Sequence, residues 1–192
     1  MNNNMEPLEN DSTDKKSKES FHKIKVLLIQ VLLFGTMLSI DQITKHYAYT
    51  LLKGKEPFSL IKGVLEFYYL QNSGAAFGML QNQKFFFIFV AILFSVIILF
   101  VLIKAPNLKK YNALHFCLVA IMAGAVGNMI DRIRYDYVID FIYFKLINFP
   151  IFNVADICVT CATAGLMILL LFVYKEDDLS FLSFKQKKYR QL

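Results

Sequence analysis

The chain has 192 residues, of which 56% are hydrophobic and 19% charged, and its formal net charge is +6. A soluble domain of this size carries about a quarter charged residues, and the charges here are bunched between long apolar runs. This composition excludes a disordered chain and an ordinary cytosolic globule. It also argues against a nucleic-acid partner, because the basic residues lie beside the apolar runs, where membrane topology explains them. We therefore expect an integral membrane protein.

Residues 1–22 are polar and rich in Asn, Lys, Glu and Ser, which predicts a disordered tail. Four uncharged apolar segments follow: Val26–Ile40, Phe85–Ile103, Ala113–Ile130 and Ile157–Tyr174. A helix needs about 20 residues to cross roughly 30 Å of hydrocarbon, and snorkelling lysines extend the short first segment. The predicted fold class is an all-α membrane protein with four transmembrane helices, in one domain over residues 23–175, followed by a basic tail over 176–192.

Lysine and arginine counts predict the orientation of the spans. The two tails and the linker Lys104–Asn112 together hold 13 of these residues, whereas the loops Asp41–Lys84 and Asp131–Ile151 hold 8. We therefore expect both termini in the cytoplasm and both loops on the extracytoplasmic side.

This topology gathers the unusual polar residues on the extracytoplasmic face. They lie at the outer ends of the first, third and fourth spans or in the two outer loops: Asp41, Asn72, Asn128, Asp131, Arg132, Asp140, Asn153 and Asp156. Polar groups at membrane depth are costly and usually functional. Their convergence on one face predicts a site there.

Asp140 and Asp156 stand out because each is embedded in apolar sequence, within Val138–Ile142 and Phe152–Ile157. The segment between them is short enough to fold back and bring the two carboxylates together. Two carboxylates in a low-dielectric site hold a shared proton, so the pair can activate a water as base and donate a proton as acid, as in aspartic proteases.

Structural readings of the same acids stay open: Asp156 as the cap of the last helix, and Asp131 with Arg132 as an interfacial ion pair. The sequence offers few residues for other catalytic mechanisms. The three histidines form no H-E-x-x-H motif, so neither a metal site nor a cofactor is expected. Cys158 and Cys161 lie in an apolar helix pattern and are interpreted as structural.

Four motifs lie in order at the expected helix ends: Asp41–Lys45, Asn72–Gly78, Gly127–Arg132 running on to Val138–Phe141, and Phe152–Asp156. With the four spans in register, they cover about residues 24–174. On these motifs the chain resembles the bacterial lipoprotein signal peptidases, the type II signal peptidase family.

The resemblance implies a membrane-embedded aspartic endopeptidase of the inner membrane, with residues 23–175 as the peptidase domain. It would remove the signal peptide from prolipoproteins that carry a lipobox and a diacylglyceryl-cysteine, cleaving on the amino side of that cysteine. Roles carry over by motif, with Asp140 and Asp156 as the catalytic pair. The positions implied to bind substrate are Asn72, Asn128, Arg132 and Asn153, and those implied to support the site are Asp41, Lys45 and Asp131.

The family fold adds a small extracytoplasmic β-sheet, which we expect from Pro57–Phe77, where Val64–Tyr69 has strand-like composition. The partners expected are the prolipoprotein and membrane lipids, and the chain itself is expected to be a monomer. Two positions depart from the family pattern, because Asp136 and Ala162 stand where glycine is usual. A proton-coupled transporter and a silent membrane scaffold are alternatives, although clustering of the acids at one face disfavours a transport route.

Overall fold

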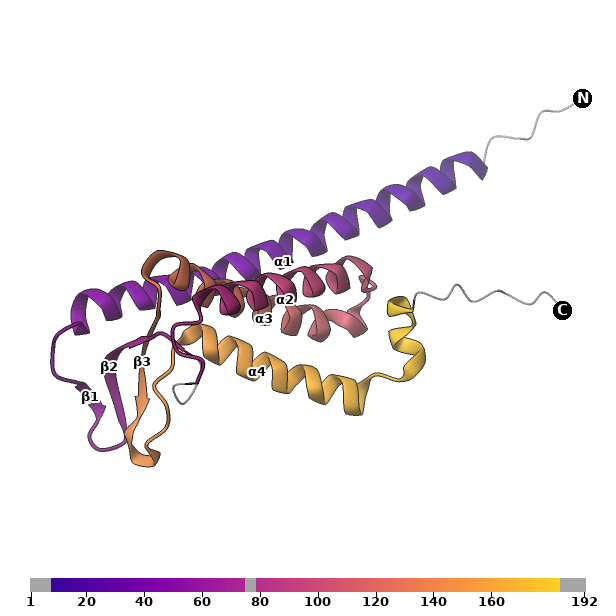
Figure 1. Cartoon of the computed structure of the whole chain (residues 1–192). Coiled ribbons are helices and arrows are strands. Elements are labelled where there is room, and N and C mark those ends of the chain that lie inside the picture. Colours follow the sequence, from indigo (N-terminus) through magenta and orange to yellow (C-terminus); the bar gives the residue numbers. More distant parts are fainter. Residues whose placement is uncertain (1–7, 75–78, 184–192) are drawn as a thin grey trace, which may run out of the picture.

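The computed structural model describes residues 8–74 and 79–183, and within them the chain forms four long helices and one sheet. The helices are α1 Leu8–Leu52, α2 Lys84–Lys104, α3 Asn112–Tyr135 and α4 Val154–Ile168, and a π-helical turn, η4 Leu169–Val173, continues the last. The strands are β1 Phe58–Ile61, β2 Leu65–Asn72 and β3 Val138–Phe144. Short 3₁₀ helices are η2 Lys109–Tyr111, η3 Lys145–Ile147 and η5 Glu176–Leu182. Figure 1 shows the helices bundled together and the sheet at one end of the bundle.

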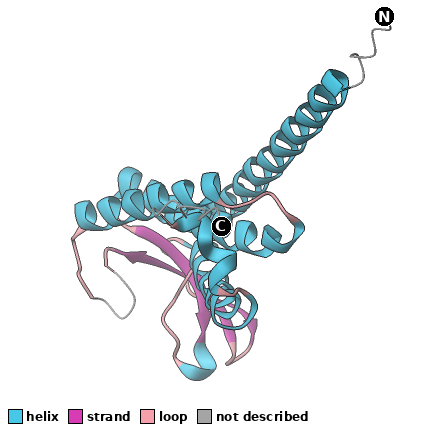
Figure 2. Cartoon of the chain, turned by 90° about the vertical axis from the view of Figure 1, so that its right-hand side faces the viewer, coloured by secondary structure: helices cyan, strands magenta, loops and turns pink. Residues whose placement is uncertain are grey.

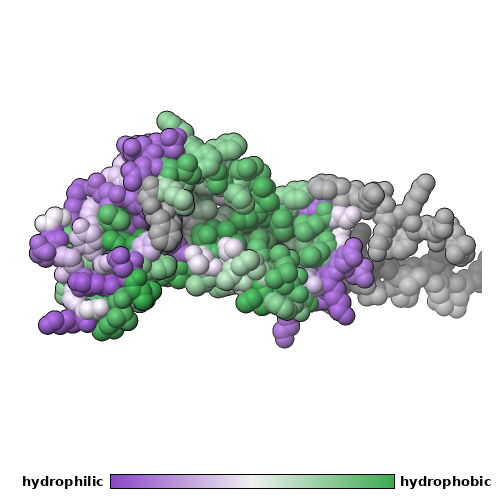
Figure 3. All heavy atoms as spheres, turned by 60° about the horizontal axis from the view of Figure 1, so that its bottom comes forward, coloured by the Kyte–Doolittle hydropathy of each residue, from purple (hydrophilic) through white to green (hydrophobic). Residues whose placement is uncertain are grey.

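Each of the four helices in the described part contains a stretch long and apolar enough to cross a membrane. Half of the apolar window of α3 is buried inside the bundle, whereas the windows of the other helices are only 6–11% buried. The centre of the bundle is therefore α3, and the other helices present apolar side chains outward, toward lipid. On the face drawn in Figure 3, hydrophobic residues cover the helical part and hydrophilic residues gather toward its ends. The four predicted spans are confirmed.

Small residues on α3 let α4 approach closely. A side chain at Gly124 would meet the carbonyl oxygen of Ala155 at 2.5 Å and the side chain of Val159 at 2.7 Å, so only glycine fits there. The close approach brings the carboxyl-terminal half of α3 beside the first turn of α4, where Asp156 lies.

The sheet is antiparallel, with strand order β1-β2-β3. Figure 2 shows its strands beyond the helical bundle. The predicted small sheet is confirmed, but β3 differs from the sequence-based expectation of a loop around Asp140. Asp140 instead lies in β3 opposite Leu70, and Ile142 further along pairs with Phe152. Residues 75–78, within the predicted sheet region and its motif, lie outside the described residues.

The first helix is longer than the sequence indicated at both ends. It starts at Leu8, within the polar tail predicted from the sequence, and it runs past Asp41 to Leu52. This segment contains no proline and a single glycine, Gly35, so nothing in it interrupts the backbone hydrogen bonds. Asp41 and Lys45 consequently lie inside a helix, one turn apart, rather than beyond its end. Residues 1–7 lie outside the described residues.

The opposite end of the bundle is closed by η5, which precedes the rest of the basic tail. The Tyr111 hydroxyl donates to the carbonyl oxygen of Asp178 at 2.9 Å, and the Tyr111 ring stacks on Tyr174. Residues 184–192, which contain all the basic residues of the predicted tail over 176–192, are outside the described part.

Candidate active site

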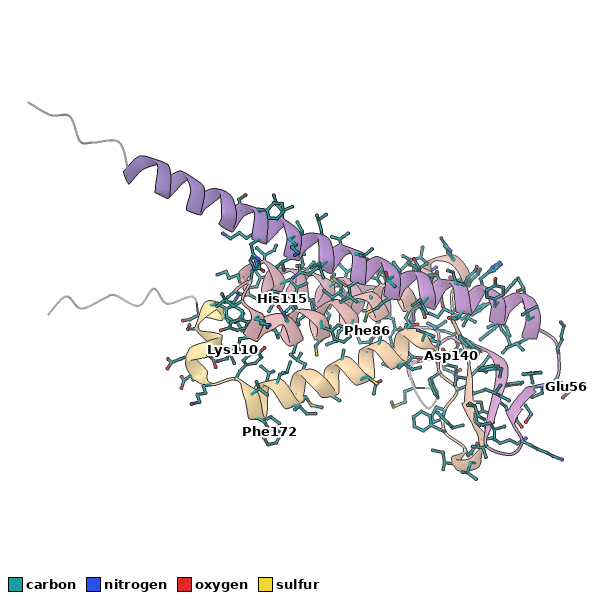
Figure 4. All side chains as sticks on the ribbon, turned by 180° about the vertical axis from the view of Figure 1, so that it is seen from behind. Glu56, Phe86, Lys110, His115, Asp140 and Phe172 are labelled. Atoms are coloured by element: carbon teal, nitrogen blue, oxygen red, sulfur yellow. The ribbon has the colours of Figure 1, made fainter. Side chains whose placement is uncertain are left out.

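Asp140 and Asp156 line one pocket of about 930 Å³, bounded by the sheet, α3, α4 and the segment before α4. Asp140 lies on β3 and is 1% exposed, whereas Asp156 lies in the first turn of α4 and is partly exposed. Figure 4 shows Asp140 where the sheet meets the helices, at the end of the bundle away from His115 and Lys110. The two acids are thus brought together, as the sequence predicted.

Asn153 joins the two carboxylates. Its side-chain Nδ2 donates to Oδ1 of Asp140 at 2.7 Å, and its backbone N–H donates to Oδ2 of Asp156 at 3.1 Å. Its Oδ1 accepts the backbone N–H of Asp156 at 3.0 Å, which completes a capping box at the start of α4. The cap reading of Asp156 is therefore correct as well, and the cap fixes the second acid beside the first.

The side-chain amides of Asn72 and Asn128 donate to the remaining carboxylate oxygens of the pair. Asn72 donates from Nδ2 to Oδ2 of Asp140 at 2.8 Å, and Asn128 donates from Nδ2 to Oδ1 of Asp156 at 2.9 Å. Both asparagines line the pocket, whereas the Asn153 side chain is 0% exposed. Asn153 therefore contacts the carboxylates rather than the pocket space.

Beneath the pair lies a buried ionic cluster in which Lys45 contacts Asp41 at 3.0 Å and Asp131 at 2.9 Å. All three side chains are about 2% exposed. The second oxygen of Asp41 accepts the N–H of Ala155 at 2.9 Å, and Oδ2 of Asp131 accepts the N–H of Ile139 at 3.1 Å. Each carboxylate thus holds the backbone of the residue just before one of the two acids. Asp131 pairs with Lys45, so the alternative of an Asp131–Arg132 ion pair is wrong.

Arg132 lies on the pocket wall. Its Nη2 donates to the carbonyl oxygen of Gly74 at 3.0 Å and its Nη1 donates to that of Asn128 at 3.3 Å. It lies close enough to Asp140 and Asp156 for electrostatic attraction.

Burial and, after it, repulsion by Asp156 raise the pKa of Asp140 from its ordinary value to about 7, against hydrogen bonds from Asn72 and Asn153 that lower it. Near neutral pH the pair therefore holds a proton. One member is positioned to donate a proton while the other accepts one.

Sequence reasoning missed Gln42, which belongs to the same cluster. Its Nε2 donates to Asp41 at 3.1 Å, to Asp131 at 3.2 Å and to the carbonyl oxygen of Gly127 at 3.3 Å. A side chain at Gly127 would collide with the Asp41 carboxylate. Gln42 directly follows Asp41 in the motif Asp41–Lys45. Extending the first helix past Asp41 would have predicted that Gln42 also lies on this helix, next to the cluster.

The fold and the site define an integral membrane protein with a hydrogen-bonded carboxylate pair at one end of a four-helix bundle. The model of the Signal peptidase (SPase) II family matches residues 33–172. The chain therefore belongs to the signal peptidase II family, a family of bacterial membrane hydrolases of the aspartic peptidase type.

Curated relatives agree with this assignment. The chain is 39% identical over 142 residues to a lipoprotein signal peptidase of Streptococcus thermophilus (strain CNRZ 1066), covering 74% of this chain and 90% of the relative. It is 37% identical over 155 residues to a lipoprotein signal peptidase of Clostridium tetani (strain Massachusetts / E88), covering 78% of this chain and 94% of the relative.

Two solved structures, each titled as a bacterial membrane enzyme, share the fold. The first has a TM-score of 0.67 at 28% identity and covers 83% of this chain and 94% of its own. The second has a TM-score of 0.65 at 30% identity and covers 76% of this chain and 94% of its own. Together with the four apolar helices, the family makes this a bacterial inner-membrane protein.

Proposed function

We propose that this chain is the aspartic endopeptidase that removes signal peptides from diacylglyceryl-modified prolipoproteins, cleaving on the amino side of the lipidated cysteine. The observation that carries the proposal is the hydrogen-bonded unit of Asp140, Asn153 and Asp156 on the wall of an open pocket. Relatives named lipoprotein signal peptidase support the substrate class.

The proposed chemistry uses the single proton held by the carboxylate pair. A water attacks the carbonyl carbon of the scissile bond and gives a proton to the ionised carboxylate, while the neutral carboxyl donates its proton to the carbonyl oxygen. The tetrahedral intermediate then collapses. Its C–N bond breaks as the pair gives a proton to the amine of the lipidated cysteine and takes one from a hydroxyl of the intermediate, which leaves a carboxyl product and a pair that again holds one proton. Asp140 and Asp156 act jointly, so neither is assigned one fixed protonation state.

The remaining polar residues take roles that follow from their contacts. Asn72, Asn128 and Arg132 line the pocket and supply donors for the peptide, although each also holds part of the site. Asn153 is fully buried and positions the two acids. The cluster of Asp41, Lys45 and Asp131 supports the backbone on which the acids lie.

The substrate lipid is expected to remain in the bilayer beside the pocket. The pocket wall on α4 is formed by Ile157, Thr160 and Cys161, of which Ile157 is 42% exposed. Burial of a lipid chain contributes about 0.8 kcal/mol per CH₂, enough for the diacylglyceryl group to position the scissile bond. Membrane lipids and the lipobox prolipoprotein are therefore the partners proposed, and one chain contains every residue invoked, which supports a monomer.

We place both termini in the cytoplasm and the pocket on the extracytoplasmic side, on the basis of the lysine and arginine counts. A reporter fused after Leu192 and another inserted at Gly63, in the β1–β2 turn, test this arrangement. Extracytoplasmic activity of the first reporter would reverse it.

The decisive test of function compares cleavage of one preprotein with and without its diacylglyceryl group by the wild type, Asp140→Asn and Asp156→Asn. We expect cleavage of the lipid-modified form by the wild type alone, with at least about a 10³-fold loss in each variant. Unchanged processing in both variants would exclude the aspartic mechanism. Equal cleavage of both preproteins would exclude anchoring by lipid.

A further inference from the structure

The guanidinium of Arg132 is held near the acid pair without touching it. Its two hydrogen bonds go to the carbonyl oxygens of Gly74 and Asn128. Within residues 8–74 and 79–183, no hydrogen bond or ion pair joins it to Asp140 or Asp156, although both attract it electrostatically. Arg132 is partly exposed, and a cation attracted by two nearby carboxylates moves toward them unless other contacts restrain it.

A third contact of the guanidinium is with an aromatic ring. The Cζ atom of Arg132 lies 4.4 Å from the centroid of the Phe87 ring, within cation–π distance. Phe87 is half-buried, whereas Phe85, Phe86 and Phe89 are 82%, 49% and 62% exposed on the apolar surface of α2. Of these four phenylalanines, Phe87 is the one that turns toward α3.

We propose that Phe87 is a positioning residue for the reaction assigned above, holding the Arg132 guanidinium away from the acid pair and presenting its unused N–H groups to the substrate peptide. This inference rests on the proposed function. A guanidinium has five N–H donors, of which the two carbonyl contacts use two, and stacking against a ring uses none. With respect to the described residues, 8–74 and 79–183, three donors therefore remain for a peptide carbonyl oxygen in the pocket.

A second contact between α2 and α3, an ion pair, is too weak to position Arg132 in place of the Phe87 ring. Lys84, one turn before Phe87, pairs with Asp136, one turn after Arg132, at 2.6 Å. The Asp136 side chain is 78% exposed, so this pair is screened by solvent and holds the helix ends only weakly. The ring is sheltered, and stacking is stronger when the cation is desolvated.

The test measures kcat, KM and their pH dependence for Phe87→Leu, with Phe89→Leu as the matched control. Phe89 is 62% exposed on the same helix, so its change removes an equal ring from the lipid-facing side. We expect Phe87→Leu to lower kcat/KM by about 3- to 30-fold, the range for losing one cation–π contact. We also expect its loss of activity at high pH to begin at a lower pH, because the released cation approaches the pair and favours loss of its proton. Phe87→Tyr keeps a ring and should retain wild-type behaviour.

A merely structural role for Phe87 predicts a lower melting temperature with an unshifted pH profile. That result, or equal losses in Phe87→Leu and Phe87→Tyr, would overturn the proposal, as would Phe87→Leu matching Phe89→Leu. Phe87→Met replaces the ring by a flexible unbranched side chain and gives the same comparison if Phe87→Leu does not fold. Absence of cleavage by the wild type would instead count against the proposed function.

Discussion

Replacing Lys45 by Met gives the sharpest test of the cluster beneath the acid pair. Lys45 is 2% exposed and is the cation that contacts both Asp41 and Asp131. Met preserves most of the side-chain volume, so the change removes the charge with little effect on packing. Two carboxylates would then lie buried beside each other without a cation.

The expected cost follows from those two contacts. At an effective dielectric constant of about 20, a charge pair about 3 Å apart gains about 5 kcal/mol of Coulomb energy before desolvation is subtracted. Removing one partner of a buried pair costs about 3–5 kcal/mol, because an uncompensated charge stays behind. For a chain of this length that corresponds to a fall in melting temperature of about 6–20 °C.

Thermal unfolding of the purified protein in one detergent, at fixed pH, measures this difference. Lys84→Met is the matched control, since it removes a lysine from an ion pair of 2.6 Å whose aspartate is 78% exposed, and should cost at most about 1 kcal/mol. Adding Asp41→Asn and Asp131→Asn to Lys45→Met should restore part of the loss by removing the unpaired charges. Equal melting temperatures for Lys45→Met and Lys84→Met would refute the reasoning.

Three further predictions concern Asp140 and Asp136. Because the pKa of Asp140 is about 7, kcat/KM should fall above that pH by about tenfold per unit as the shared proton is lost, and a rate still rising at about pH 9 would contradict this. The raised pKa also means that the unfolded chain loses this proton near pH 4 and the folded chain near pH 7. Stability should therefore decrease across that interval in the wild type, and less so in Asp140→Asn, as followed by thermal unfolding. Asp136 has φ = 70°, so Asp136→Gly should change the free energy of unfolding by less than about 1 kcal/mol, whereas Asp136→Val should cost about 1–2 kcal/mol more than glycine. Equal stability of the glycine and valine variants would show that the left-handed conformation imposes no constraint.

The four spans and the meeting of the two acids could be predicted because each depends on local sequence. An uncharged run of about 20 residues has few alternatives to a membrane helix. Once the spans are set, Asp156 must lie at the start of the last one, and the short connection before it keeps Asp140 at the same end.

What could not be predicted depends on contacts between distant segments. The strand β3 forms because Val138–Phe144 pairs with β2, which a pattern of mostly apolar residues does not specify. Phe87 cannot be told from Phe85 and Phe86 in sequence, since only the packing of α2 against α3 turns it inward. Asp136, which stands where the family usually has glycine, caps the end of α3. It adopts the left-handed conformation that glycine usually occupies there, and it gains an ion pair with Lys84.

Lys45 connects the buried cluster to the acids by a second route, through the orientation of one amide. Its Nζ donates to Oδ1 of Asn128 at 2.8 Å, so the Nδ2 of that amide must face the other way, where it donates to Asp156 at 2.9 Å. The same Oδ1 accepts from Asn153 at 3.2 Å, and Asn153 also donates to Asp140. If the Asn128 amide were rotated by 180°, its NH₂ group would face the lysine cation and its oxygen would face the carboxylate, so both contacts would be lost. The lysine charge thus fixes a donor on each acid without contacting either.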